Sequence, residues 1–327
     1  MVTEPARQSY PIRNWRYRRG RSLAAWLVYL MLRVVKRMMP ADYGDPAGFV
    51  NGTRRLAARS EGLMPKIPAD VRVESFRIGE VPAHRFTAPG AEAGRVLLYL
   101  QGGGYIMGSP MTTHRDLIWR LSQACGCAVV SIEYGLAPEN QYPVALDQAV
   151  AAYRYLLEQF DAAAIALAGD SAGGCLALAT ALRLRDDGLP MPAALCLLSA
   201  ETDLTGSGES VKLNIRRDHV IPAASIGMVG TLYAGAAALT DPYVSPVFGE
   251  YHGFPPTLLQ VGGEEVFLDD SLRVAAKLKA AGIPHVVDIW QGMPHVWQGF
   301  AAMMPEGRAA IEDIGRFVRG HLRRSMR

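Results

Sequence analysis

The sequence predicts an α/β fold in which helices cover both faces of a mostly parallel central sheet of about eight strands. The first observation is that, from residue 95 onward, short apolar runs typical of buried strands alternate with longer stretches of helical periodicity. This alternation is typical of parallel strands joined by helices. The second observation is that residues 71–88 form two alternating runs around Gly79-Glu80, a pattern that predicts a β-hairpin. With 327 residues and 50% hydrophobic side chains, the chain can bury a large core.

The individual elements follow from apolar spacing and from the turn residues between them. Two helices are expected near the N-terminus, at residues 23–39 and 45–61. The strands are expected at residues 71–78, 81–88, 95–100, 128–132, 165–168, 194–198, 257–261 and 285–290. The later helices are expected at residues 112–124, 146–159, 175–182, 268–281 and 311–322.

One segment does not fit the alternation of strands and helices. Residues 204–247 lie between two expected core strands, are rich in Gly and Ala, and contain a helical stretch at 223–234. We expect an N-terminal cap segment at residues 1–70 and a main domain at residues 71–327, with 204–247 as an insertion. The insertion and the N-terminal helices would together form a lid.

Charge is unevenly distributed along the chain. Residues 1–40 hold nine basic residues and one acidic residue, a net charge of +8, whereas the whole chain carries +3 and the remainder therefore carries −5. A basic arm of this kind can attract nucleic acid or an anionic membrane surface. No interleaving of aromatic and basic residues continues beyond the arm, so we expect no nucleic-acid partner.

The helix expected at residues 23–39 has two interpretations. No small-residue cleavage site follows its apolar run, and Arg33 interrupts the run, which argues against a signal peptide and against a transmembrane helix. Residues 1–40 could make a peripheral contact with lipid, or the helix could cover the body of the protein. We favour the second interpretation, because apolar helical faces usually pack against a core.

The cysteines and histidines suggest neither a disulfide framework nor a metal site. The few cysteines include no C-x-x-C pair and are expected to be core thiols in a reducing compartment, the cytoplasm: Cys125, Cys127, Cys175 and Cys196. No pair of histidines has metal-ligand spacing, so we expect no metal and no cofactor. Two histidines in expected strands are interpreted as packing or surface residues, and three others have no acid–serine context: His84 and His285, then His114, His219 and His252.

The stretch most informative about chemistry is G-D-S-A-G-G at residues 169–174. It follows the apolar run at 165–168 and precedes a helical stretch, so its serine lies on a strand-to-helix turn. In that setting, G-x-S-x-G holds the serine in strained backbone geometry, with its hydroxyl exposed above the sheet at the positive end of a helix. Ser171 is therefore a candidate nucleophile.

A second candidate feature is the run of three glycines at residues 102–104, directly after an expected strand. Consecutive glycines cost backbone entropy without adding packing. They are useful where backbone N–H groups must approach a ligand closely, as when an acyl transfer places negative charge on a carbonyl oxygen. These glycines are therefore candidate donors to an oxyanion.

The remaining candidates follow the last two strands. Glu264 and Glu265 come after the strand at 257–261, and His295 lies in a loop after the strand at 285–290. Loops at the carboxyl ends of parallel strands are where α/β enzymes carry their chemistry. Serine, acid and histidine thus follow one another in the chain, each after a strand.

These motifs, in this order, resemble those of α/β-hydrolases of the hormone-sensitive-lipase-like family of carboxylesterases. The resemblance extends from about Arg95 to Phe300 and rests on several short motifs: residues 102–104, 134–139, 169–174, 202–204, 241–246, 268–270 and 292–297. It implies a hydrolase core with a cap built from the N-terminal segment and an insertion. It also implies an oxyanion hole made by the N–H groups of Gly103, Gly104 and Ala172.

Three positions depart from the family pattern. Gln101 stands where the glycine motif normally opens with histidine, Gly135 stands where arginine is usual, and residues 199–202 lack the usual Pro-Trp. None of these departures removes a reacting group. We expect Gln101, together with Gly102, to support the oxyanion loop, because glutamine offers a donor and an acceptor at a similar reach. Asp170 is interpreted as structural support.

The family pattern also selects between the two neighbouring glutamates. It places the catalytic acid four residues before the first carboxylate of the following helix, which assigns the role to Glu265 rather than Glu264. Asp269 and Asp270 would then be cap and first-turn residues of that helix, where their charges favour its positive end.

The motifs and the resemblance together predict a serine carboxylic-ester hydrolase that acts on short- to medium-chain esters. Ser171 would attack the ester, His295 would take its proton, and Glu265 would orient the imidazole. A lactone hydrolase or N-acetyl deacetylase of secondary metabolism remains an alternative, as does a non-catalytic ligand-binding protein of the same fold. The expected partner is a small-molecule ester, and a homo-oligomer is compatible with the sequence.

Overall fold

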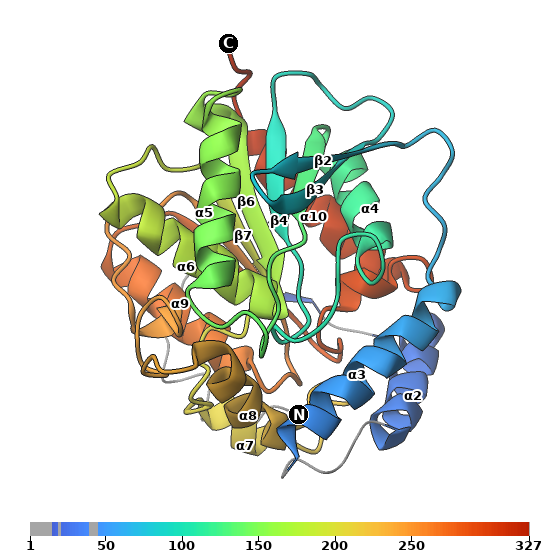
Figure 1. Cartoon of the computed structure of the whole chain (residues 1–327). Helices are drawn as coiled ribbons and strands as arrows, with labels where there is room; N and C mark the ends of the chain where they lie inside the picture. The colour runs from blue at the N-terminus through green and yellow to red at the C-terminus, as the bar shows by residue number, and fades with distance from the viewer. Residues whose placement is uncertain (1–14, 19–20, 39–44, 327) are drawn as a thin grey trace.

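The computed structural model describes residues 15–18, 21–38 and 45–326, and these build one twisted sheet with helices on both sides (Figure 1). The sheet has nine strands in the order β1-β9-β8-β7-β6-β4-β5-β3-β2. The first seven strands in this order, which begin with β1 and end with β5, are each parallel to their neighbours. By contrast, β3 pairs antiparallel with β5, and β2 pairs antiparallel with β3. The predicted mostly parallel α/β architecture is confirmed.

The strands are β1 (Trp15–Arg18), β2 (Arg72–Ile78), β3 (Val81–Thr87), β4 (Val96–Leu100), β5 (Ala128–Ile132), β6 (Ile165–Asp170), β7 (Ala194–Leu198), β8 (Thr257–Gly262) and β9 (His285–Trp290). The α-helices are α2 (Leu23–Met38), α3 (Pro46–Ser60), α4 (Arg115–Cys125), α5 (Val144–Leu157), α6 (Ser171–Asp186), α7 (Glu209–Leu213), α8 (Ala223–Ala234), α9 (Leu268–Ala280) and α10 (Pro305–His321). The short 3-10 helices are η1 (Glu61–Leu63), η2 (Ala162–Ala164), η3 (Pro246–Phe248) and η4 (Trp297–Phe300).

The central strands are buried on both faces, as their continuous apolar runs predict. Along β4, Leu98 and Leu100 point to the core layer that includes residues of α5, α6 and α9, whereas Leu97 and Tyr99 point to the layer that includes residues of α4 and α10. Every residue of β4 is fully buried. The period of two places successive side chains on opposite faces, so one short strand contributes to both cores.

Four helices lie together at one end of the molecule, at the bottom of Figure 1. They are α2 and α3 from the N-terminal segment and α7 and α8 from residues 204–247. Arg54 of α3 donates to the carbonyl of Ile106 at 2.8 Å and pairs with Glu139 at 2.7 Å, which fixes α3 on loops of the main sheet. Tyr29 of α2 donates to the carbonyl of Arg217 at 2.6 Å, so the two predicted parts of the lid are in contact.

Some elements differ from the sequence-based expectations. The helix of the insertion begins at Ala223 and ends at Ala234 as predicted, but α7 was not predicted, and α10 begins six residues earlier than expected. Residues 15–18 form the edge strand β1, parallel to β9, although they contain no apolar run. Backbone pairing with β9 makes this strand, and local pattern cannot reveal such pairing. These four residues therefore belong to the main sheet, and we propose a cap of α2, α3 and the insertion rather than the whole of residues 1–70.

Gly173 is the position at which a small backbone change should cost the most. A Cβ atom there would lie 2.1 Å from the carbonyl oxygen of Leu100, so Gly173→Ala must push α6 away from β4. We expect denaturant unfolding to show a loss of about 3 kcal/mol, the upper range for overpacking. Gly320→Ala in α10 is the matched control, because nothing lies within 4 Å of its added methyl group. It should be neutral or stabilising by about 0.5–1 kcal/mol, and equal losses in both variants would contradict this account.

Candidate active site

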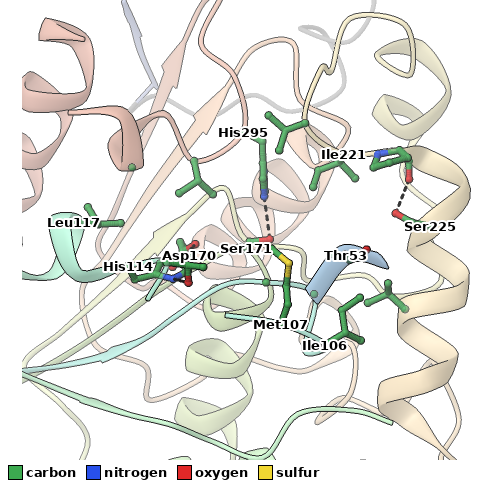
Figure 2. A pocket seen from close by; sticks show the side chains of 18 of the residues that line it. Thr53, Ile106, Met107, His114, Leu117, Asp170, Ser171, Ile221, Ser225 and His295 are labelled. Atoms are coloured by element: carbon green, nitrogen blue, oxygen red, sulfur yellow. Dashed lines mark hydrogen bonds and ion pairs between the residues drawn. The ribbon is translucent and has the colours of Figure 1, made fainter. Parts of the chain in front are cut away.

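Ser171 is the first residue of α6 and lies on the turn that follows β6. Its φ of 52° is in the left-handed region, which is strained for a residue with a side chain. The glycines on either side permit the turn, since a Cβ on Gly169 would lie 2.2 Å from the carbonyl oxygen of Gly173. The predicted strand-to-helix turn at this serine is thus present, and the hydroxyl projects from it into a cavity (Figure 2).

Ser171, His295 and Glu265 form a continuous chain of hydrogen bonds. The Nε2 atom of His295 lies 2.9 Å from the hydroxyl of Ser171, and its Nδ1 atom lies 2.8 Å from Oε2 of Glu265. His295 is 5% exposed and Glu265 is 1% exposed. The structure therefore brings together the three side chains that the sequence singled out, from loops separated by up to 124 positions.

The two neighbouring glutamates point in different directions. Glu264 is partly exposed and pairs with Arg21 at 2.5 Å, and its Oε2 atom lies 2.9 Å from the hydroxyl oxygen of Tyr29. Glu265 is buried, and its Oε1 atom accepts from the backbone N–H of Gly262 at 2.5 Å. Only Glu265 reaches His295, which agrees with the family pattern used above.

Ser199 is a residue of this site that the sequence did not single out. It follows β7 with a φ of 47° and is fully buried. Its hydroxyl donates to Oε1 of Glu265 at 2.8 Å and accepts from the N–H of Val296 at 3.1 Å. It therefore joins the loop of the acid to the loop of the histidine. A serine after a strand is too common a pattern to reveal this role from sequence alone.

The surroundings of His295 favour a charged imidazolium. Burial disfavours the charge and lowers the pKa of His295, but the hydrogen bond and negative charge of Glu265 raise it more, with further contributions from Asp218 and Asp170. The net result is a pKa above the usual value of about 6.5 for histidine. This is the expected electrostatic setting for a base that must hold a proton transiently.

The glycine loop after β4 is braced by Asp170. Its carboxylate accepts from the N–H of Gly102 at 2.9 Å and from the hydroxyl of Tyr99 at 2.5 Å, and it pairs with His114 at 3.2 Å. Burial raises the pKa of Asp170, but the charge and hydrogen bond of His114, with the other two donors, lower it below its usual range. Asp170 is therefore an ionised support, as predicted, whereas His114 has an acid partner that the sequence did not reveal.

Two of the three predicted oxyanion donors line the same cavity. Gly103 and Gly104 both have positive φ and line the cavity with Ser171. Among the described residues, no hydrogen bond uses the N–H group of Gly103 or Gly104. Ala172 lies in the first turn of α6, where N–H groups have no acceptor within the helix.

The expected hydrogen bonding by the Gln101 side chain is wrong for this structure. The side chain is fully buried, and neither its amide nitrogen nor its amide oxygen has a hydrogen-bond partner among the described residues. The support at this position comes from Tyr134, whose hydroxyl donates to the backbone carbonyl of Gln101 at 2.6 Å. The family histidine suggested a side-chain role that the surrounding side chains do not provide.

The cavity beside Ser171 has a volume of about 330 Å³ and is mostly apolar. In Figure 2, His114 and Leu117 lie on one side of Ser171, whereas Thr53, Ile106, Ile221 and Ser225 lie on the other. Met107 points its sulfur toward Ser171. The lining comes from the main domain, from α3, and from α8 and the residues before it, so the proposed cap forms one wall of the cavity.

The described residues also show the state of the cysteines, the grouping of potential metal ligands, and the lengths of the apolar helices. All four cysteines are free and buried, as expected for core thiols. Within residues 15–18, 21–38 and 45–326, no three or more His, Cys, Asp or Glu side chains are arranged to hold a metal ion. Over the same ranges, none of the helices combines the length and apolar character needed to span a bilayer. His84 is more than a packing residue, because it pairs with Glu133 at 3.0 Å.

Comparison with known proteins places the chain in a family. Residues 97–299 match the family model described as alpha/beta hydrolase fold. The chain belongs to the α/β-hydrolase family. An acetyl-hydrolase of Streptomyces hygroscopicus is 41% identical over 292 residues, which cover 88% of this chain and 96% of that protein. An esterase of Acinetobacter venetianus is 36% identical over 259 residues, which cover 78% and 84% of the two chains.

Solved structures agree with the family assignment. An esterase from the bacterial hormone-sensitive lipase family superposes with a TM-score of 0.86 at 38% identity, covering 93% of this chain and all of that chain. The predicted membership of this α/β hydrolase in the hormone-sensitive-lipase-like family is confirmed. The prediction that it is a hydrolase enzyme of the esterase class is confirmed with it.

Residues 199–202, which depart from the family pattern, place a second carboxyl group close to the site of this α/β hydrolase. Glu201 stands directly before Thr202-Asp203, where the family has tryptophan, and is 4% exposed. Its N–H donates to the carbonyl of Ser171 at 3.2 Å. Burial raises the pKa of Glu201 to about 7, while His295 opposes the shift and Asp203 adds to it. The departure from the motif was the only signal in the sequence for this group.

The two glutamates provide a matched pair of variants. Glu265→Gln should lower kcat by about 10⁴-fold, because an amide supplies no charge and can hold the wrong imidazole tautomer. Since Glu265 raises the pKa of His295, its loss should also move the acid limb of the pH–rate profile to lower pH. Glu264→Gln should cost less than about tenfold and leave the limb in place. An unchanged acid limb in Glu265→Gln would contradict the assignment.

The variant Ser199→Ala should distinguish a role of Ser199 in positioning Glu265 and His295 from a role in the stability of the fold. It removes a donor to Glu265 and leaves the half-buried N–H of Val296 without its acceptor, which together cost about 1–3 kcal/mol. Ser131→Ala is the control, because that hydroxyl is equally buried and donates only to the carbonyl of Tyr99. Both variants should lose stability in denaturant, but only Ser199→Ala should lower kcat, by about tenfold, with KM little changed. Equal kcat values in the two variants would show that Ser199 is merely structural.

Proposed function

We propose that this α/β hydrolase is a serine carboxylic-ester hydrolase that works through an acyl-enzyme. The observation that carries the proposal is the buried chain of hydrogen bonds Ser171–His295–Glu265, which ends at a serine hydroxyl in an apolar cavity. A nucleophile, a base that it contacts, and a group that orients the base are the parts required for covalent acyl transfer.

In the proposed first step, Ser171 Oγ attacks the ester carbonyl carbon while His295 Nε2 takes the hydroxyl proton. The carbonyl oxygen becomes negative and is stabilised by the N–H groups of Gly103, Gly104 and Ala172. The imidazolium then gives the proton to the leaving alcohol, and the C–O bond of the ester breaks. Glu265 stabilises the imidazolium throughout but stays ionised.

In the second step, water attacks the acyl-enzyme. His295 takes a proton from the water and returns it to Ser171 Oγ, so that a carboxylic acid leaves and the enzyme is restored. The two steps together consume one ester and one water and release one alcohol and one carboxylic acid. The N-terminal end of α6 adds a favourable field for the negative charge at this point.

We infer short- to medium-chain esters as substrates from the size and lining of the cavity. A volume of about 330 Å³ is at the small end for binding pockets. The acyl and alcohol parts would occupy the two sides of Ser171 seen in Figure 2. A similar structure, that of EstE5 at 37% identity, comes from a crystal soaked with p-nitrophenyl butyrate. A four-carbon acyl group of that size suits the cavity of this chain.

Removal of an acetyl group is a second candidate, and one observation favours it. The Streptomyces hygroscopicus relative, which covers nearly the whole chain, is named an acetyl-hydrolase. Hydrolysis of an acetyl amide or an acetyl ester would use the same Ser171 chemistry on a two-carbon acyl group. A substrate series that contains both bond types distinguishes these candidates.

The experiment is a series of p-nitrophenyl esters from two to twelve acyl carbons, run beside N-acetyl amides. We expect burst kinetics, because the acyl-enzyme accumulates, and a maximum of kcat/KM at or below about eight carbons, an order-of-magnitude limit for a small pocket. Ser171→Ala should lower kcat by about 10⁴–10⁶-fold. Equal slow turnover by wild type and Ser171→Ala would instead support the non-catalytic binding protein.

A further inference from the structure

Helix α2 is apolar on two opposite sides. Its inner side, with Ala25, Val28 and Leu32, is buried against Trp290 and Trp297. The interpretation that this helix covers the body of the protein therefore accounts for one side of it. The outer side needs a separate explanation.

Polar contacts fix the inner side in place. The hydroxyl of Tyr29 donates to the carbonyl of Arg217, and Nζ of Lys36 donates to the carbonyl of Asp218 at 2.5 Å. Just before the helix, Nε of Arg21 donates to the carbonyl of Gly292 at 2.7 Å. These contacts hold one defined face of α2 toward solvent.

The outer face carries a continuous apolar stripe. Its members recur at the spacing of one helical face, and each exposes between 41% and 74% of its surface: Leu23, Trp26, Leu27, Leu30, Met31 and Val34. They make up six of the eleven large hydrophobic side chains that the described residues expose. An exposed apolar patch of this kind marks a site of interaction with a protein or a membrane. We call these six residues the α2 stripe.

Two exposed cations lie beside the α2 stripe. Arg33 and Arg37 extend from the same side of the helix, and neither forms an ion pair with another described residue. The helix contains no acidic residue. Outward tryptophan and leucine next to arginine is the composition of helices that lie in the interface of a bilayer.

The charges distinguish a lipid partner from a second copy of the chain. Two copies joined through α2 would bury apolar residues but would offer the arginines no carboxylate from the partner helix. An anionic bilayer supplies both an apolar layer and negative headgroups. We propose that the α2 stripe, with Arg33 and Arg37, is a docking surface for an anionic lipid bilayer, and that the enzyme binds it peripherally.

Docking there would bring the active-site cavity close to lipid. Val220 and Phe300 pack against the same buried cluster as the inner side of α2, and both of these residues line the cavity. An apolar ester dissolved in the membrane would then have a short path to Ser171. This consequence rests on the proposed function, whereas binding to the bilayer does not depend on it.

The test is flotation of the full chain with vesicles of phosphatidylcholine, with and without phosphatidylglycerol. Wild type should float with the anionic vesicles and bind at least tenfold less in 0.5 M salt, because screening weakens surface charge attraction. Leu27→Glu/Leu30→Glu should lose at least tenfold in binding. Arg33→Gln/Arg37→Gln should bind more weakly and respond less to salt.

Arg324→Gln/Met326→Glu is the matched control, because it changes the net charge by the same amount at the C-terminal end, opposite α2 in Figure 1. It should bind within twofold of wild type. All variants should hydrolyse a soluble acetate ester within twofold of wild type, which shows that they are folded. Flotation measures binding and needs no turnover. A protein that does not bind vesicles but hydrolyses esters would therefore contradict only the docking proposal, and one that binds vesicles but hydrolyses no ester would contradict only the proposed function.

Three outcomes would overturn the proposal. Wild type does not float with anionic vesicles, or Leu27→Glu/Leu30→Glu floats as well as wild type. Alternatively, sedimentation shows that wild type is a dimer without affinity for vesicles and that Leu27→Glu/Leu30→Glu is a monomer. The last result would make the α2 stripe an interface between copies.

Discussion

The contact on which the active site depends is one between backbones, where the start of α6 meets the end of β4. The position of a Cβ on Gly173 is filled by the carbonyl oxygens of Leu100 and Gln101, at 2.1 and 2.4 Å. Such proximity requires a residue without a side chain. Because of it, Ser171 after β6 and the glycine loop after β4 share one small volume. Any wider separation of these elements would move the proposed oxyanion donors away from Ser171.

Buried carboxylates then hold the loops that arrive at this point. Asp170 ties the glycine loop to the nucleophile, and Glu265 ties the acid loop to His295. Asp270 accepts from the N–H groups of Thr202 and Asp203 at 2.7 and 2.9 Å and so holds the segment that carries Glu201. A buried polar group is costly unless it is hydrogen-bonded, so each of these acidic side chains restricts its loop to few conformations. This restriction is how a site built on loops becomes preorganised.

The cap connects the site to the surface of the molecule. Helices of the proposed cap contribute one wall of the cavity, and α2 shares a buried cluster with Met293 and Trp297, which flank His295 in the chain. The same helix presents apolar residues outward. One element thus contributes to the packing of the site and to a surface with no described partner, and its two sides are subject to different constraints.

Local sequence was sufficient for much of the fold, and it singled out the three side chains that meet at the candidate site. The period of the apolar residues predicts β4, α2 and α8, because burial of one face or of both determines that pattern. The G-x-S-x-G turn predicts Ser171, since few backbones tolerate the geometry it requires. The resemblance to the family pattern selects Glu265 over Glu264, and the structure brings the same residue to His295.

Long-range contacts determined the remainder. Strand β1 is formed by pairing with the edge of β9, and its four residues, which alternate aromatic and basic side chains, are too short a run to predict a strand by themselves. Ser199 joins two loops, and His114 pairs with Asp170, through contacts between residues 66 and 56 positions apart. Within the described part of the chain, the Gln101 amide has no hydrogen-bond partner, an outcome set by the tertiary surroundings of this side chain. The sequence pattern predicts which residues are buried and which lie in turns. The tertiary structure determines which of these residues come into contact, because hydrogen bonds and ion pairs depend on distance in space.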